Sequence, residues 1–590
     1  MKQVSNAYKS SMNSMLRNRS YVKIAFSNID TSAATDGSWV SNGAQSYSEF
    51  DTVDYDYDYQ APYATLELNR WALDGNAVII PASGTIYDGF VSSIMSNAYG
   101  GFTTAAVITR EFSVPHTFPG LTLTFDTRYK EWPVSVTVDF YLNGEVLEST
   151  TAPVTSETVQ INTRAASCDK IVITFGNTLP YRRPRLENVL YGVQKVFTNE
   201  NIISTRQSHD VDPLSRRLPQ ETMQFVILDY EHNYDPDNPS GIYQYVDKNS
   251  PVSIQFGYEL PDGKVEWLKP DKYVLNSKPK ASKNQATFSG TGLIGSLSGT
   301  FYKSKLGSKN FYDMAEEVLL DADLTPTERG TNPWVIDESL KEMFTTAALP
   351  IDTHMNCLQL IAHACRCRLF TDDDNIIHIK PFVLDNVDSV KTDFMLDFTS
   401  IAENSQSLSK IDQLKAVSVA KYAYMVDGET NTLYEETTTE TQLHVEFSGL
   451  AQDVQISVSG GTLVSSSIYA RAADLVLSSG TKTVVITGKS LSENSVVVSY
   501  PVNPDGEIDK EENPLITNDE MCSTLANHVI KYLQMRSTYD TSYRGNPELE
   551  VGDIIGLQTL YTSEMDALIL VDEITFNGSL SGKMKVKGLI

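Results

Sequence analysis

Four side chains in the middle of the chain are of types that bind transition metals: Cys357, His363, Cys365 and Cys367. Zinc sites commonly take paired ligands about two to four residues apart, with a second pair elsewhere. Here the closest pair has the spacing Cys-x-Cys, and no second pair follows. Cys357, Ile361 and Cys365 instead recur at every fourth residue on one face of a predicted helix, which is typical of core packing. We therefore expect free thiols in a core, with no metal site and no cofactor.

A turn at residues 235–239, with the sequence Asp-Pro-Asp-Asn-Pro, has oxygen atoms of the kind that coordinate Ca²⁺. A calcium loop of the EF-hand type needs carboxylates at alternating positions, a glycine and a terminal glutamate, and this spacing is absent. Proline and Asx side chains are also the residues that form tight turns. We favour a simple turn, and bound calcium stays open as the alternative.

The sequence has none of the common local signatures of an enzyme. It has no Gly-x-Ser-x-Gly elbow, no His-Glu-x-x-His helix and no Cys-x-x-Cys pair. Its eight histidines are scattered, and paired carboxylates are unavoidable among 75 acidic residues, so their number does not support a glycosidase. We predict a protein that is not an enzyme. An enzyme that degrades cell-wall polysaccharide is the less favoured alternative.

The composition indicates a folded, acidic protein. Of the 590 residues 41% are hydrophobic, which is enough to fill several cores and excludes a disordered chain. The balance of 47 basic against 75 acidic residues gives a formal charge of −28. Nucleic acid is therefore an unsuitable partner, because phosphates are neutralised by clustered Lys and Arg. Five scattered cysteines are too few for a disulfide framework in a chain of this size.

No segment predicts a membrane span or a secretory signal. The first residues lack the apolar stretch of a signal peptide, so we expect no export by the ordinary secretory route. No run approaches the roughly 18 apolar residues that are needed to cross a bilayer.

Strand signals dominate the sequence, and the predicted fold class is mainly β with an α+β lobe. Residues 134–141 alternate in the manner of a half-buried strand, and Asn143–Gly144 follows them. An Asn-Gly pair marks a hairpin, because both central residues of a type I′ turn need positive φ. About seven or eight such short strands between residues 51 and 192 indicate an antiparallel sandwich. Residues 410–510 have strand signals again.

Apolar residues at helical spacing predict four helices, over residues 5–17, 311–320, 356–368 and 519–536. The last helix is preceded by Thr517, and Glu520 follows at the spacing of a capping box. The two central helices lead into a hairpin whose turn contains residues 372–375. Two helices followed by a hairpin predict the α+β lobe.

A charged turn lies between the last predicted helix and the closing strands. Its residues are Arg544, Gly545, Asn546, Pro547, Glu548, Gly552 and Asp553. The two glycines permit positive φ or tight conformations, and the proline fixes φ in a segment that cannot be a central strand. Local chemistry predicts a rigid turn that positions strands or contacts a neighbouring subunit, and no catalysis.

Three motifs in combination resemble the tail-hub and tail-tip proteins of phages that infect Gram-positive bacteria. The first is the charged turn at residues 544–553. The second is a pair of helix motifs, Val-Leu-Leu-Asp-Ala-Asp-Leu at 318–324 and Leu-Gln-Leu-Ile-Ala at 358–362. The third is a strand, an Asn-Pro turn and a second strand, in which the turn contains Asn238, Pro239 and Gly241. The resemblance covers about residues 1–26 and 193–590.

The resemblance implies two hub β-barrels with an α+β domain between them and a β-sandwich inserted in the first. The implied segments are 1–30 (N-terminal helix and first hub strand), 31–195 (inserted jelly-roll), 196–305 (first hub barrel), 306–395 (α+β lobe), 396–510 (second hub β-domain) and 511–590 (helix and closing strands).

The resemblance also implies a structural function as the hub of a tail tip, which closes the tail tube and connects it to the host-attachment apparatus. It implies a homotrimer, because two related barrels in each of three chains match a six-fold tube. The implied partners are the distal tail protein, the tape-measure protein, and fibres or receptor-binding proteins. The implied location is the tail tip of the virion, after assembly in the host cytoplasm.

Residues 63–75 resemble the opening of a jelly-roll module of the galactose-binding-like type. Sandwiches of this type commonly bind sugars, with aromatic faces against C–H groups and carboxylates against hydroxyls. The candidate glycan-binding residues are Trp71, Tyr87, Asp88, Tyr129 and Trp132. A Trp in a sandwich is more often a core residue, so packing or particle assembly is favoured over sugar binding. A host-attachment protein that binds cell-wall glycan is the alternative function.

Overall fold

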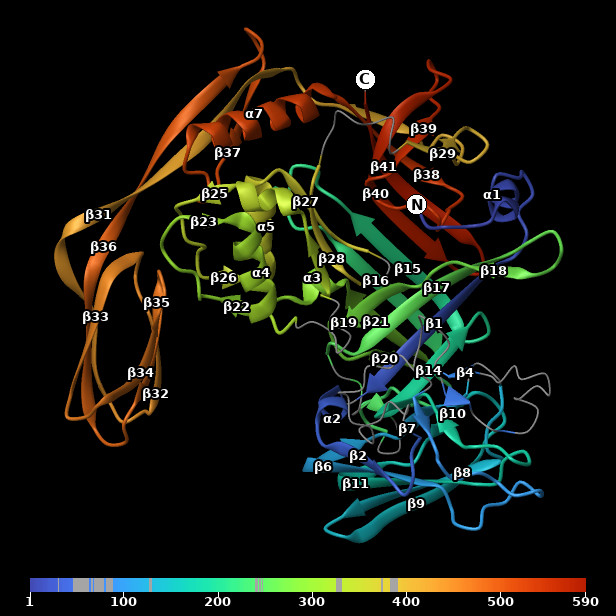
Figure 1. The fold of residues 1–590 in the computed structure, drawn as a ribbon. Coiled ribbons are helices and arrows are strands. Elements are labelled where there is room, and N and C mark those ends of the chain that lie inside the picture. Colours follow the sequence, from blue (N-terminus) through green and yellow to red (C-terminus); the bar gives the residue numbers. More distant parts are fainter. Residues whose placement is uncertain are drawn as a thin grey trace.

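The computed structural model describes residues 1–29, 31–45, 63–64, 67, 79–80, 89–126, 130–238, 242–243, 246, 248–324, 332–372, 375–382 and 391–589. The fold is mainly β with a small α+β part, as predicted. Among the described residues, 15 strands form one continuous sheet, and Figure 1 shows the separate modules that project from it. None of the helices in the described ranges combines the length and apolarity that crossing a bilayer requires.

The first part of the large sheet curls back on itself. Its strands, in spatial order, are β14 (Gly192–Thr198), β1 (Ser20–Ile29), β17 (Pro251–Glu259), β19 (Asp271–Leu275), β21 (Gln285–Thr291), β16 (Glu221–Leu228) and β15 (Ile202–Asp210). The outermost strands β14 and β15 are consecutive in the chain and are joined by a tight turn, in which Asn201 N–H donates to Thr198 O. Phe225 and Phe288 stack inside the curl with ring centroids 4.6 Å apart.

The second part of the sheet has the same organisation. Its strands, in spatial order, are β29 (Lys391–Leu396), β39 (Ile554–Leu557), β40 (Met565–Phe576), β41 (Leu580–Gly588), β38 (Ser537–Tyr543) and β30 (Ser407–Lys410). Its outermost strands, β29 and β30, are again consecutive in the chain. Residues between them bond back to the end of β38, where Ala402 N–H donates to Ser542 O. The sheet is thus built from segments on both sides of residues 411–536.

Strand β40 joins the two parts. One edge of β40 pairs with β41 along most of its length. The opposite edge pairs with β39 over Met565–Leu568 and then with β15 over Val571–Phe576. β39 and β15 therefore diverge from one edge of β40 at residues 569–570. A single hydrophobic cluster runs through both curled parts, so they share one core.

A β-sandwich is inserted between β1 and β14, which pair with each other up to Ile29 and Gly192. One sheet contains β2 (Ser38–Ser41), β6 (Val107–Phe118), β11 (Ala165–Phe175), β8 (Ser135–Leu142) and β9 (Glu145–Pro153). The other contains β10 (Thr158–Ile161), β7 (Leu121–Thr124) and β13 (Asn188–Leu190). Phe118, Leu123 and Ile173 are buried between the sheets. The predicted hairpin is confirmed, because Asn143 and Gly144 both have positive φ between β8 and β9.

The α+β lobe contains α4 (Phe311–Asp321), α5 (His354–Ala364), β24 (Trp334–Ile336), β28 (Ile377–Pro381) and β27 (Cys367–Thr371). The helix predicted over residues 356–368 ends at Ala364, because Arg366 has φ +59° and β27 begins directly after it. Cys357 and Cys365 are buried in the lobe core. All five cysteines are free and buried, as predicted.

A long arm follows β30 (Figure 1). Its spine is β31 (Leu414–Thr438) against β36 (Lys482–Pro501), flanked by β33 (Ala451–Ser459) and β37 (Glu507–Glu511). A second small sheet contains β32 (Gln442–Glu446), β35 (Ala472–Leu477) and β34 (Leu463–Ile468). The arm touches the lobe through Tyr302, whose hydroxyl donates to Asp474 at 3.2 Å and whose ring centre lies 4.4 Å from that of His444.

Two terminal helices differ from prediction in their limits. The first, α1, spans only Asn6–Met12, and Met15 and Leu16 beyond it are exposed. Helix α7 spans Asp519–Gln534, and its cap is Asn518, whose side chain accepts from Met521 N–H at 2.9 Å. The predicted Thr517 cap was wrong by one residue, because an Asx side chain caps a helix as well as a hydroxyl does.

Candidate functional site

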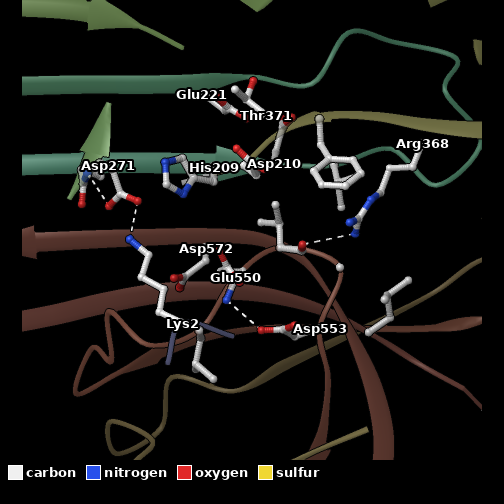
Figure 2. A pocket seen from close by; sticks show the side chains of 18 of the residues that line it. Lys2, His209, Asp210, Glu221, Asp271, Arg368, Thr371, Glu550, Asp553 and Asp572 are labelled. Carbon is white, nitrogen blue, oxygen red and sulfur yellow. Dashed lines mark hydrogen bonds and ion pairs between the residues drawn. The ribbon is translucent and has the colours of Figure 1, made fainter. Parts of the chain in front are cut away.

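A cavity of about 550 Å³ lies at the point where β39 and β15 diverge from β40. Its walls come from β15, β16 and β19 of the first curled part, from β40, and from the lobe hairpin β27–β28. Residues 547–553 of the charged turn form one side of the cavity, and Lys2 of the N-terminal segment enters from another side. Figure 2 shows acidic, basic and aromatic side chains that converge there from segments far apart in the chain.

Gly552 brings the charged turn close to the lobe. Its φ of +89° is left-handed, and a Cβ added there would lie 1.7 Å from the Arg368 guanidinium. Arg368 Nη1 also donates a 3.4 Å hydrogen bond to the carbonyl oxygen of Val551. Gly545 has φ +66°, so both glycines have the positive φ that the sequence predicts for them. A residue with a side chain at 552 would separate the turn from the lobe.

The centre of the turn faces inward. Asn546 and Glu548 are only 1% and 2% exposed, and burial raises the pKa of Glu548. The side-chain oxygen of Asn546 accepts hydrogen bonds from Tyr8 OH and from the backbone N–H of Glu548, both at 3.2 Å. Lys9 of α1 lies 3.6 Å from a Glu548 oxygen. These side chains therefore attach α1 to the turn.

Two arginines strengthen the same attachment. Arg17 Nη1 donates to the carbonyl oxygens of Arg544 and Gly545, both at 2.6 Å. In return, Arg544 Nη1 donates to the carbonyl oxygen of Ser14 at 2.9 Å. Burial lowers the pKa of Arg17 to about 10. The turn that closes the second curled part is thus bound to the first residues of the chain.

Lys2 places an ammonium group inside the cavity. Its backbone N–H donates to Glu548 O at 2.8 Å, and its ammonium pairs with Asp271. Gln207 Nε2 donates to the second Asp271 oxygen at 3.1 Å. Although burial favours the neutral acid, the charge of Lys2 and the hydrogen bonds from Lys2 and Gln207 hold the pKa of Asp271 below its usual value. The pair joins the N-terminal segment to β19.

Tyr273 organises the neighbouring polar groups. Its hydroxyl accepts from Gln207 Nε2 at 2.9 Å and lies 2.5 Å from His209 Nε2. Burial lowers the pKa of His209, which favours a neutral imidazole, and raises that of Tyr273 well above its usual value. This network is neutral and fixes the side chains of β15 against β19.

Two acids in the cavity have strongly raised pKa values. Asp572 of β40 is 5% exposed and accepts a 2.8 Å hydrogen bond from Tyr543 OH. Burial raises the pKa of Asp572 to about 7. Burial also raises the pKa of Glu221, at the start of β16, to about 7. Both carboxyl groups therefore keep their protons to a higher pH than exposed acids do, and a cation placed beside them would favour their ionised forms.

The structure places the sequence-predicted residues in different regions. The charged turn lines the cavity, whereas Asn238 lies in a separate turn, where its side chain donates to His232 O at 2.9 Å. Trp132 is half-buried and packs against the sandwich core. The remaining predicted residues, Pro239, Gly241, Trp71, Tyr87, Asp88 and Tyr129, lie outside the described residues. The glycan site therefore stays a prediction.

Sequence reasoning identified Asp553 with the charged turn but missed Lys2 and the acids Asp271, Glu221 and Asp572 of the same cavity. One signal was present: Asp572 occupies the same inward face of β40 as Ile574 and Phe576. An acid at such a position is unusual, because a buried charge needs a partner. The pairing of Lys2 with Asp271 had no local signal, since the two residues meet only through the fold.

The described residues contain no cluster of three or more His, Cys, Asp or Glu side chains arranged to hold a metal ion. No protein-family model matches the sequence, and no curated protein matches it significantly.

Several solved structures are similar to the chain. One is the tail protein from Neisseria meningitidis MC58, with 9% identity, TM-score 0.35, and coverage of 66% of this chain and 93% of that chain. A second is the 43 kDa tail protein of prophage MuSo2 from Shewanella oneidensis, with 8% identity, TM-score 0.35, and coverage of 66% and 94%. A third is prophage tail protein gp18 from Listeria monocytogenes EGD-e, with 9% identity, TM-score 0.35, and coverage of 67% and 91%. At these scores the likeness assigns no function.

Proposed function

We propose that the chain is a structural component of the tail tip of a phage or phage-like particle. In this role it forms the hub that closes the tail tube and connects it to the host-attachment apparatus. The observation that carries the proposal is the pairing of β15 with β40, which fuses two similarly curled sheets into one unit. The sequence motifs that resemble tail-hub proteins include the charged turn at this junction.

The two curled sheets, fused through β15 and β40, have an arrangement that is suited to assembly into a ring. Three copies of the chain would place six curled sheets around one axis, which matches the six-fold symmetry of a tail tube. A homotrimer is therefore the assembly that we propose. Rigidity within each copy supports this role, because the two curled parts share a single hydrophobic core and cannot turn independently.

The sandwich and the arm project from the large sheet and are suited to contacts with other proteins at the periphery of the assembly. The sandwich and the arm both leave the large sheet and return to it, so their outer surfaces are available to other proteins (Figure 1). We propose the distal tail protein and the tape-measure protein as partners of the sheet. Fibres or receptor-binding proteins are the proposed partners of the modules. This function requires no catalytic residues, in keeping with a protein that is not an enzyme.

The mass of the purified full-length chain in solution tests the ring. Native mass spectrometry should give a trimer, and negative-stain images should show three-fold rings that are close to a tail tube in width. A protein that stays monomeric at micromolar concentration would contradict the proposed assembly.

Binding of host cell-wall glycan by the sandwich is the second candidate function. It is favoured by Trp132, which lines a shallow hollow beside an ion pair in which Arg182 Nε lies 2.6 Å from Glu131. An aromatic face beside charged groups is the combination that sugars need. Glycan-array binding by the full-length chain should decrease in Trp132→Ala. An absence of binding to any wall glycan would exclude this function.

A further inference from the structure

Most of the acidic side chains that line the cavity have a cationic partner, but two of them do not. Five of its acids have a partner: Asp271 with Lys2, Glu550 and Asp553 with the Met1 ammonium, Asp210 with Arg217, and Asp372 with His378. Asp572 and Glu221 differ from them. No ammonium or guanidinium group of the described residues lies within ion-pair distance of either side chain. The cavity therefore has two acids whose ionised forms have no cationic partner among the described residues.

Asp572 is the deeper of the two acids. Only one of its carboxyl oxygens has a hydrogen bond, from Tyr543, and the side chain is 5% exposed. Apolar residues of the same strand, Leu568 and Ile574, line the cavity beside it. The second oxygen has no donor and is reached by solvent, because it is not one of the fully buried, unpartnered side-chain atoms of the described residues. A ligand that donates to this oxygen would replace water there with a charge-assisted hydrogen bond.

Glu221 lies on another wall, beside Thr371 of the lobe hairpin (Figure 2). It belongs to β16, whereas Asp572 belongs to β40, so the two acids come from the two different curled parts. A ligand with a cationic group at each end, or one that contacts both acids, would bridge the junction.

The same cavity already holds one alkylammonium group. The Lys2 side chain is buried, and its ammonium contacts Asp271 and the carbonyl oxygen of Lys269, the latter at 3.4 Å. With Lys2 in place, about 550 Å³ stays open, which is within the roughly 300–1,000 Å³ of ordinary small-ligand sites. The size and the chemistry both suit a second group of this kind.

The apolar residues of the cavity wall favour a cation that has an aliphatic chain over a bare metal ion. Phe370, Phe382, Leu549 and Val551 contribute to the walls and would pack against methylene groups. A bare metal ion does not fit, because no three ligating side chains of the described residues converge. We propose that the cavity binds an alkylammonium group, supplied either by a lysine side chain of a partner protein or by a free aliphatic diamine, with Asp572 and Glu221 as its acceptors.

Calorimetric titration of the full-length protein tests the proposal with three probes. The first is 1,5-diaminopentane, the second is a lysine residue blocked at both backbone ends, and the third is 1-pentanol, the neutral control. We expect at least one of the amines to bind more tightly than the alcohol. Binding of the diamine alone indicates a small-molecule ligand, and binding of blocked lysine indicates a partner's side chain. If neither amine binds better than the alcohol, the proposal is overturned.

Variants localise the binding. Asp572→Asn should weaken binding of the amine about tenfold or more, because a charge-assisted hydrogen bond is lost. Glu221→Gln provides an independent variant if the first does not fold. Asp540→Asn, on the half-exposed surface of β38, is the matched control and should leave binding unchanged. Equal affinities in all three variants would place the amine elsewhere and overturn the proposal.

Discussion

The hydroxyl of Tyr543 donates a 2.8 Å hydrogen bond to Asp572, and both side chains are buried. Tyr543 ends β38, whereas Asp572 lies on β40, and β41 separates these two strands in the sheet. The bond therefore crosses the inside of the second curled part. Tyr543 OH also accepts from Asn546 N–H at 3.4 Å, so one hydroxyl connects the junction strand to the charged turn.

We expect Asp572→Asn to change the pH dependence of stability. Burial above all, with smaller contributions from the charges of Glu573, Asp271 and Asp553, raises the folded-state pKa of Asp572 to about 7 against the opposing Tyr543 hydrogen bond. The folded state thus keeps a proton that the unfolded state releases near pH 4. The stabilising contribution is complete below that pH and is lost as the pH rises through about 7.

The asparagine variant cannot ionise, so it should lack this loss. Its free energy of unfolding, relative to that of the unmodified protein, should increase by about 2–4 kcal/mol between pH 5 and pH 8. Urea unfolding at a series of pH values measures the difference. Asp540→Asn is the control, and parallel pH profiles for Asp572→Asn and the unmodified protein would show that Asp572 is not protonated in the fold.

Tyr543→Phe should destabilise the protein by about 1–2 kcal/mol, because a buried carboxyl group loses its hydrogen-bond donor. The same change should raise the pKa of Asp572, since the hydrogen bond favours the ionised form. Carbon-detected NMR of the carboxyl group follows this pKa directly. A pKa that is unchanged or lower in the variant would contradict the geometry.

Gly552→Ala should destabilise the protein more than Gly578→Ala. Both glycines have positive φ, +89° and +101°, so both variants incur the same backbone strain of about 1–2 kcal/mol. Only at Gly552 does the new methyl group meet the Arg368 guanidinium, because nothing lies within 4 Å at Gly578. Denaturant unfolding should show an additional loss of about 1–3 kcal/mol at Gly552. Equal losses would mean that Arg368 moves away freely.

Arg17→Ala should loosen α1 from the charged turn. The variant loses two short hydrogen bonds to the carbonyl oxygens of residues 544 and 545. Amide hydrogen exchange in α1 and in the turn should become about tenfold faster or more. Arg19→Ala is the matched control, because this neighbouring arginine is exposed. Similar exchange in both variants would argue that other contacts hold α1.

Tyr302→Ala should release the arm from the lobe. The variant loses the hydrogen bond to Asp474 and the ring contact with His444. Faster hydrogen exchange is expected in residues 442–477, while the core of the large sheet stays protected. Tyr561→Ala, at a side chain that is 97% exposed, provides the control. An unchanged exchange pattern would mean that the other contacts suffice to hold the arm, namely the backbone bond from Ala470 to Ser304 and the apolar cluster that contains Ala348 and Leu450.

Patterns of neighbouring residues predicted the presence of helices, strands and turns better than the residues at which they begin and end. The Asn143–Gly144 hairpin and the core cysteines followed from short-range chemistry, because turn type and helical spacing depend on neighbouring residues. The end of α1 did not follow, since the apolar Met15 and Leu16 continued the helical pattern. Strand signals within residues 410–510 did not reveal the length of β31, because most of its later residues are exposed and polar, and pairing with β36 extends it.

The cavity was beyond sequence reasoning for a different reason. Its groups come from residues as distant as Lys2, Asp271 and Asp572, and only the pairing of β15 with β40 brings them together. The spacing of apolar residues along the sequence predicts helices and strands, but it does not predict contacts between residues so far apart in the chain. The two glycines of the charged turn were recognisable from their type, but the guanidinium that approaches Gly552 was not.

Strands β1 and β14 pair with each other up to Ile29 and Gly192, immediately before and after the inserted sandwich. In topological terms the whole sandwich is the loop of a β-hairpin, because its entry and exit are neighbouring positions on adjacent strands. A two-residue turn could replace it without any change in the register of the sheet. The chain can therefore exchange one inserted module for another of any size, while the curled sheets that carry it stay the same.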